Sequence, residues 1–163
     1  MLNLYRIVSM FIVMMLGHVS SHAGHPDDIL GHWRTFDDMT GFAKSIVRIE
    51  KSKSGLYVAR IVEIIARPDY TARETCYRCP APFTNQKILG LTIVWNLQAN
   101  PNEQDTQQYN KGYVLDPLSG KIYQTQVTLA ADNRSLKLRG SVVGAPMIGR
   151  SQTWRRETAD QRK

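Results

Sequence analysis

The fold is decided by residues 149–156, Gly-Arg-Ser-Gln-Thr-Trp-Arg-Arg, near the end of the chain. Arg139-Gly140 precedes this segment, and Gly31-His32-Trp33 offers glycine and tryptophan again near the other end. Both segments are strand-like, so we interpret them as the first and last strands of one sheet. Their meeting would close the sheet into a barrel and remove its exposed edges.

The two tryptophans have a structural explanation. In an eight-stranded up-and-down barrel, a tryptophan on the first strand fills the closed end and an arginine from the last strand stacks on its ring. Such a cation–π contact contributes about 0.5–2 kcal/mol. We expect Arg139 or Arg150 to stack in this way. The predicted closure residues, which are structural rather than catalytic, are Gly31, Trp33, Arg139, Arg150 and Trp154.

Between the two ends, short β-rich segments alternate with turn residues. Apolar and polar residues alternate within several segments, which indicates strands with one buried face. The polar stretch 98–110 is interpreted as a solvated loop, and 67–87, with three prolines and both cysteines, as the irregular loop most suited to function. This pattern predicts an all-β, antiparallel fold of eight to nine strands. The strands are expected at 31–36, 44–51, 56–65, 88–97, 112–115, 121–129, 135–143 and 147–156.

The chain begins with a pattern typical of an export signal. Arg6 precedes an apolar run over residues 7–16, and Ser21 and Ala23 supply the small residues of a cleavage site. We therefore divide the chain into a signal peptide (1–23), an entry segment (24–30), one barrel domain (31–156) and a polar tail (157–163). The mature protein is expected to be periplasmic or secreted, with no transmembrane segment; an uncleaved N-terminal anchor is the alternative.

The charge of the chain is positive. Removal of Arg6 with the signal leaves 20 basic and 14 acidic residues, a net charge of +6. Apart from Arg155-Arg156 and Arg162-Lys163 near the end of the chain, the basic residues are scattered singly, which favours a solvated surface over a nucleic-acid site. A weak association with anionic envelope surfaces is compatible with this charge. Nucleic acid is not expected as a partner, and the oligomeric state is left open.

The only cysteines, Cys76 and Cys79, lie three positions apart. In an oxidising compartment such a pair most often forms a disulfide. A redox pair would need a helix N-terminus to lower the pKa of a thiol, and no such pattern surrounds it. A zinc site would need two further ligands, and His25 and His32 are the only histidines after residue 23. We predict a disulfide and keep a thiol or metal role as an alternative.

No motif names a reaction. Asp116, Pro117 and Gly120 form a predicted structural turn, in which the carboxylate accepts hydrogen bonds from its own backbone. The chain has no phosphate-binding glycine loop and no recognisable nucleophile, base and acid set. We nominate no catalytic residue, metal ligand or cofactor.

Six motifs in order resemble a family of small exported bacterial proteins known only as a conserved uncharacterised domain. The resemblance covers 31–156 and implies a lipocalin- or calycin-like barrel, without an established activity. Two departures concern Ala59, where family members often carry glycine, and the stretch 98–110, which lacks an expected Trp-Gly pair. The matching motifs are Gly31-x-Trp33, Asp37-Asp38-x-Thr40-Gly41, Cys76-x-x-Cys79, Asp116-Pro117-x-x-Gly120-Lys121-x-Tyr123, Leu138-x-Gly140 and Gly149-Arg150-x-x-Thr153-Trp154-x-Arg156.

An eight-stranded barrel is wide enough to hold one small ligand or to be filled by its own side chains. The leading hypothesis is an exported protein that binds a small, largely apolar ligand. A barrel packed solid, with a partner on its outer surface, is the competing hypothesis. A slip of one residue in strand parity would exchange the lining for its neighbours. The predicted lining consists of Tyr57, Ile61, Leu91, Ile93, Tyr113, Tyr123 and Val127.

Overall fold

The computed structural model of the protein describes residues 25–67, 71–100 and 107–158. A short 3-10 helix, η1 (Pro26–Ile29), leads into eight consecutive strands. The strands are β1 (Gly31–Phe36), β2 (Ala43–Lys51), β3 (Tyr57–Ile64), β4 (Thr92–Ala99), β5 (Gln107–Leu115), β6 (Ile122–Leu129), β7 (Ser135–Val142) and β8 (Ala145–Arg156).

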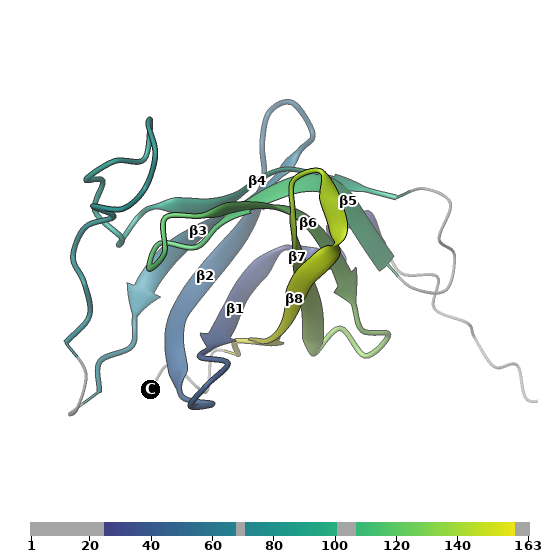
Figure 1. The fold of residues 1–163 in the computed structure, drawn as a ribbon. Helices are drawn as coiled ribbons and strands as arrows, with labels where there is room; N and C mark the ends of the chain where they lie inside the picture. Colours follow the sequence, from purple (N-terminus) through teal and green to yellow (C-terminus); the bar gives the residue numbers. More distant parts are fainter. Residues whose placement is uncertain (1–24, 68–70, 101–106, 159–163) are drawn as a thin grey trace, which may run out of the picture.

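Each strand pairs antiparallel with the next, and β8 returns to β1, which closes the barrel (Figure 1). This confirms the predicted all-β antiparallel barrel and fixes the strand count at eight. The closing contact is short, because β1 meets β8 only at Trp33↔Arg156 and Arg34↔Arg155. Beyond these pairs β8 stays with β7 and curves away from β1.

Two predicted strands are wrong in extent. The strand expected to begin at residue 112 begins at Gln107, inside the stretch interpreted as a loop, and the strand expected from residue 88 begins at Thr92. In β5, an extra residue between Tyr109 and Gly112 shifts the register with β6, and Lys111 has a φ of 59°. Such a bulge breaks the alternation by which a strand is recognised. Pairing with the neighbouring strands overrides the polar composition.

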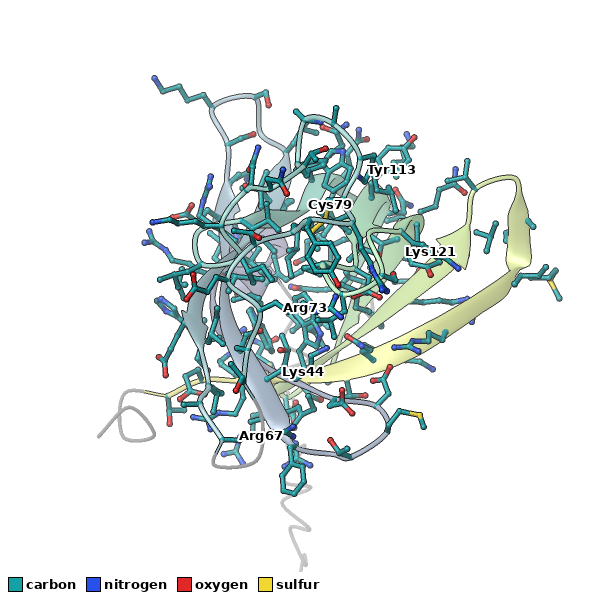
Figure 2. All side chains as sticks on the ribbon, turned by 60° about the vertical axis from the view of Figure 1, so that its left-hand side comes forward. Lys44, Arg67, Arg73, Cys79, Tyr113 and Lys121 are labelled. Carbon is teal, nitrogen blue, oxygen red and sulfur yellow. A yellow bond between two sulfur atoms is a disulfide. The ribbon has the colours of Figure 1, made fainter. Side chains whose placement is uncertain are left out.

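The connections sort into two ends of the barrel. The turns after β2 and β6 lie with η1 at one end, which we call the closed end. The connections after β1, β3, β5 and β7 lie at the opposite end, which we call the mouth. The connection from β3 to β4, of which residues 65–67 and 71–91 are described, therefore belongs to the mouth, and Figure 2 shows it at the front of the molecule. No helix in the described ranges has the length and apolar character needed to cross a bilayer.

Candidate functional site

The closed end is built around Trp33, which is fully buried and donates from Nε1 to the carbonyl of Ile29 at 2.9 Å. The guanidinium of Arg156 stacks on its ring, 4.2 Å from the centroid. The same guanidinium donates to the carbonyl oxygens of Asp28, Leu30 and Asn133. Arg156 thus joins η1, the β6–β7 turn and the two closing strands. Burial lowers the pKa of this guanidinium.

The sequence prediction of which arginine stacks on Trp33 is wrong. A stacked tryptophan is present, but its partner is Arg156 and neither Arg139 nor Arg150. Arg139 donates to the carbonyls of Pro146 and Met147 at 3.2 and 3.5 Å, and Arg150 pairs with an aspartate near the mouth. The register explains the difference, because Trp33 lies opposite Arg156 where β1 and β8 meet.

An ion pair between β1 and the residue after β8 reinforces the closure. Arg34 donates to both carboxylate oxygens of Glu157, at 2.8 and 2.7 Å, and the carboxylate is almost completely buried. The hydrogen bond from Arg34 to this carboxylate raises the pKa of the arginine. A bidentate, charge-assisted pair of this kind fixes geometry as well as adding stability. It links β1 to the residue that follows β8.

The half of the interior next to the closed end is filled by the chain itself. Tyr57 and Tyr109 meet edge to face across it, with ring centroids 5.3 Å apart. Both are almost fully buried, as are Leu97 and Leu136, which belong to the same apolar cluster. Rings packed at this spacing leave no room between them for a ligand. A ligand site in the barrel is therefore confined to the half near the mouth.

In the mouth half the inner wall contains a glycine. Gly140 pairs with Thr125, a buried residue of β6, and lies between Leu138 and the mouth on β7. A Cβ placed on Gly140 would lie 3.4 Å from Tyr123 and 3.5 Å from Val114. Those two side chains, paired across β5 and β6 and both partly exposed, therefore line the wall around a position that has no side chain.

The same wall continues onto the β7–β8 hairpin. Val142 shares the parity of the buried Leu138, and Ile148 shares that of Trp154, yet the two are 39% and 64% exposed. Side chains on the inner parity of a barrel are ordinarily covered. The mouth half thus presents apolar inner-face side chains, Val114, Val142 and Ile148, that the chain does not cover completely.

A lateral groove opens where β8 leaves β1. Its volume is about 580 Å³, and the β1–β2 turn forms one side of it. Asp38 crosses the groove, pairing with Arg150 at 2.8 Å and accepting from Gln152 at 3.1 Å. The lining consists of Phe36, Asp37, Asp38, Gly41, Arg150, Ser151, Gln152, Thr153 and Arg155. The groove is lined mainly by polar and charged residues, whereas the inner wall near the mouth is apolar.

The β1–β2 turn that carries Asp38 is held by its neighbour Asp37. The backbone N–H of Thr40 donates to this carboxylate at 2.9 Å, and the hydroxyl of Thr40 and the backbone N–H of Met39 add two more hydrogen bonds. Chiefly because of the backbone bond from Thr40, the pKa of Asp37 is lowered. The turn is ordered by its own hydrogen bonds and positions Asp38 over the groove.

The cysteine loop is anchored rather than free. Cys76 and Cys79 form a disulfide with a Cα separation of 5.4 Å, and both are buried. On the outer face of the barrel Trp95 lies between Phe83 of the loop, whose ring is tilted, and Tyr113 of β5, on which it stacks, with ring centroids 5.2 and 5.9 Å away. The disulfide thus belongs to a layer that fixes the long connection against β4 and β5.

The predicted turn at 116–120 packs against the cysteine loop. The carboxylate of Asp116 accepts from the backbone N–H of Leu118 at 3.0 Å, and the disulfide sulfur of Cys76 lies 3.4 Å from the carbonyl oxygen of Pro117. Gly120 has a φ of 75°, and a Cβ there would fall 2.0 Å from the carbonyl oxygen of Arg78. The turn is structural, as its residues indicate, and glycine allows the loop to approach it closely.

The residues predicted to line the ligand site lie in different parts of the structure. Tyr57, Ile61 and Val127 are buried in the core cluster, and Tyr123 lies on the inner wall near the mouth. Leu91 and Ile93 are buried in the same cluster, where the long connection joins β4. The predicted inner position of Tyr113 is wrong, because its side chain lies on the outer face of the barrel against Trp95. The bulge in β5 moves it there by shifting the parity by one residue.

The sequence reasoning missed the residues that line the mouth. Gly140 was recognised only as part of a motif, and Val142 and Ile148 lie in a stretch without alternation. The pairing of β7 with β8, which fixes their faces, includes a register shift after Ser141. Among the described residues, no three His, Cys, Asp or Glu side chains gather in positions that could hold a metal ion.

The closed eight-stranded antiparallel barrel, the helical turn across one end and the arginine stacked on a first-strand tryptophan define a lipocalin-like β-barrel. The chain belongs to the family DUF2147, described as "Uncharacterized protein conserved in bacteria", whose profile matches residues 31–156. A comparison with curated proteins finds no significant match.

Among solved structures, the chain is similar to protein HP1028 from the human pathogen Helicobacter pylori, which is described as belonging to the lipocalin family. The TM-score is 0.66 at 18% sequence identity, over 82% of this chain and 85% of the other. At this identity the likeness concerns the fold alone.

Proposed function

We propose that this protein is an exported carrier of a small, largely apolar ligand, which it holds in the mouth half of the barrel. The observation that carries the proposal is the inner face next to the mouth, where Val142 and Ile148 stay exposed and Gly140 adds no side chain to the wall. Burial of apolar surface is the main source of affinity in such sites. The lipocalin-like fold supports this class of function.

Export is part of the proposal and rests on the sequence. Residues 1–23, which lie outside the described residues, carry the signal pattern, and disulfides such as Cys76–Cys79 persist mainly in oxidising compartments. Fractionation of producing cells with intact mass measurement tests this. A periplasmic or secreted chain beginning at residue 24 is expected; a full-length chain in the cytosol contradicts it.

Ligand binding is tested with the neutral apolar dye N-phenyl-1-naphthylamine, by fluorescence titration. Gly140→Leu places a large side chain into the mouth, and we expect dye affinity to fall about tenfold or more. Ser141→Leu is the matched control, because it adds the same side chain one residue along, on the opposite face of β7. Equal dye affinity in both variants, or no dye binding by the unaltered protein, overturns the proposal.

Native mass spectrometry of protein purified from its own cells identifies the natural ligand. A co-purified apolar molecule that Gly140→Leu loses and Ser141→Leu retains is expected. Protein that is consistently free of ligand favours the competing function, a barrel that acts through its outer surface. The packed closed half, with Tyr57 and Tyr109 in contact, is the observation that favours this second candidate.

A thiol-exchange role for the cysteines is less well supported by the geometry. Cys76 is fully buried and Cys79 is 4% exposed, so an attacking thiolate has no open approach to either sulfur. The contacts of the disulfide are those of a structural staple. Titration of free thiols in the folded protein, before and after mild reductant, separates the two roles, since a staple resists reduction until the protein unfolds.

A further inference from the structure

The exposed apolar side chains of this protein are confined to one end of the barrel. In the described part of the chain, each large hydrophobic side chain that is exposed lies in or next to a mouth connection. These side chains are Met39, Phe42, Val62, Tyr77, Leu89, Val142, Val143, Met147 and Ile148. Single exposed apolar residues are normal on a soluble protein, whereas a group gathered on one surface marks an interaction site.

The densest part of this group is the tip of the β7–β8 hairpin. Val142 and Val143 precede the turn at Gly144 and are 39% and 57% exposed. Met147 and Ile148 follow the turn and are 90% and 64% exposed. Figure 2 shows this hairpin extending away from the barrel body. Four apolar side chains therefore project at one protruding turn.

The charge of the hairpin has one sign. Residues 135–156 include no acidic residue and five basic ones: Arg139 and Arg150 lie near the tip, whereas Lys137, Arg155 and Arg156 lie toward the closed end. Arg139 lies directly behind the tip, since it donates to the carbonyls of Pro146 and Met147. Arg150 follows Ile148 by two residues and is 72% exposed, and its guanidinium pairs with Asp38 at 2.8 Å. Figure 2 also shows Lys44, Arg73 and Lys121 on the mouth face.

We infer that the β7–β8 hairpin docks the mouth of the barrel onto an anionic lipid bilayer. The tip inserts Val143, Met147 and Ile148 between lipid headgroups, while Arg139 and Arg150 face the phosphates. An apolar tip flanked by basic side chains matches the two attractions that hold peripheral proteins on anionic membranes. A second copy of the chain is a poorer occupant, because two hairpins of the same positive charge repel each other.

Vesicle co-sedimentation tests the inference, with vesicles of phosphatidylcholine alone and with phosphatidylglycerol added. We expect the protein to bind the mixed vesicles. Its affinity for vesicles of phosphatidylcholine alone should be lower, by about fivefold for each arginine that contacts the anionic headgroups. The double variant Met147→Ser/Ile148→Ser should bind at least about tenfold more weakly, since it removes two inserting side chains. Unchanged binding by this variant overturns the inference, as does binding insensitive to both anionic lipid and salt.

The matched control is Val62→Ser/Leu89→Ser, which removes two exposed apolar side chains from β3 and its following connection, on the wall opposite β7. Its vesicle binding should stay within about twofold of the unaltered protein, because these side chains are not at the inserting tip. Equal losses in the two double variants contradict docking by the hairpin. Urea unfolding of both variants confirms that each remains folded.

Light scattering after gel filtration measures the oligomeric state and tests the alternative, that the hairpin tip binds a second copy of the chain. A dimer that Met147→Ser/Ile148→Ser dissociates, without vesicle binding by the unaltered protein, assigns the tip to self-association and overturns the inference. Dye binding is measured separately, in the absence of vesicles, to test the ligand site alone. Loss of dye binding in Gly140→Leu with vesicle binding retained separates the ligand site from the docking surface.

Discussion

Replacement of Arg156 by methionine should destabilise the closed end of the barrel. Methionine keeps an apolar stem of similar length over Trp33 but removes the guanidinium. That group donates to three carbonyls, of Asp28, Leu30 and Asn133, and lies 4.2 Å from the ring centroid of Trp33. The segment 28–33 and the β6–β7 turn, which are distant in sequence, lose their common partner at once.

The magnitude follows from these contacts. A hydrogen bond to a charged group contributes about 1.5–3 kcal/mol, and the cation–π contact about 0.5–2 kcal/mol. Because Arg156 is only partly buried, water can reach some of the released carbonyls and the lower values apply. We expect the free energy of unfolding to fall by about 3–5 kcal/mol. For a domain of this size the midpoint temperature falls by about 10 °C.

The assay is urea unfolding followed by tryptophan fluorescence, because Trp33 and Trp154 are both buried. Arg155→Met is the control: Arg155 is exposed and its guanidinium lies 5.4 Å from the ring of Phe36, so a loss below about 1 kcal/mol is expected. Arg156→Lys keeps the charge without the planar fork and should lie between the two. An Arg156→Met variant within about 1 kcal/mol of the unaltered protein refutes this account of the closure.

Three further predictions concern the mouth. Gly149→Ala places a Cβ 2.3 Å from a carbonyl oxygen of the facing strand, so we expect a loss of about 1–3 kcal/mol in urea unfolding; an unchanged midpoint contradicts the pairing of β7 with β8. Cys76→Ala/Cys79→Ala opens a loop of three-residue separation, and the chain-entropy relation gives a loss of about 2 kcal/mol under non-reducing conditions, with no difference from the reduced unaltered protein. The lowered pKa of Asp37 means that its carboxylate stabilises the fold above the ordinary carboxyl pKa, and that this contribution is lost as pH falls through the folded-state pKa. The stability difference between Asp37→Ala and the unaltered protein should therefore shrink on acidification, and a difference independent of pH contradicts the role given to the turn.

Much of the fold could be predicted because the deciding signals are local. Alternation of apolar and polar residues identifies a strand wherever one face is buried, and glycine-containing turns separate the strands. β1, β2, β3, β6, β7 and β8 therefore lie within two residues of their predicted bounds. The pair Cys76 and Cys79 is equally local, since its short spacing allows a disulfide without knowledge of the fold.

The candidate site was less predictable because it depends on register. A bulge moves every following side chain to the opposite face, so Tyr113 left the predicted lining and Val114 entered it. The packing of Tyr123 and Val114 beside Gly140 becomes visible only when β5, β6 and β7 are side by side. Exposure on the inner parity, as at Ile148, reflects how far the hairpin extends beyond the barrel body, which no local pattern records.

The sequence by itself determined that two ends bearing glycine, tryptophan and arginine meet and close a barrel. Only the tertiary structure decided that Arg156 is the arginine that stacks on Trp33, because the choice depends on which residues of β1 and β8 lie opposite each other. It also decided that the half of the interior next to the closed end is filled, while inner-face side chains near the mouth stay partly exposed. Packing density is a property of side chains brought together from all the strands, and it has no counterpart along the chain.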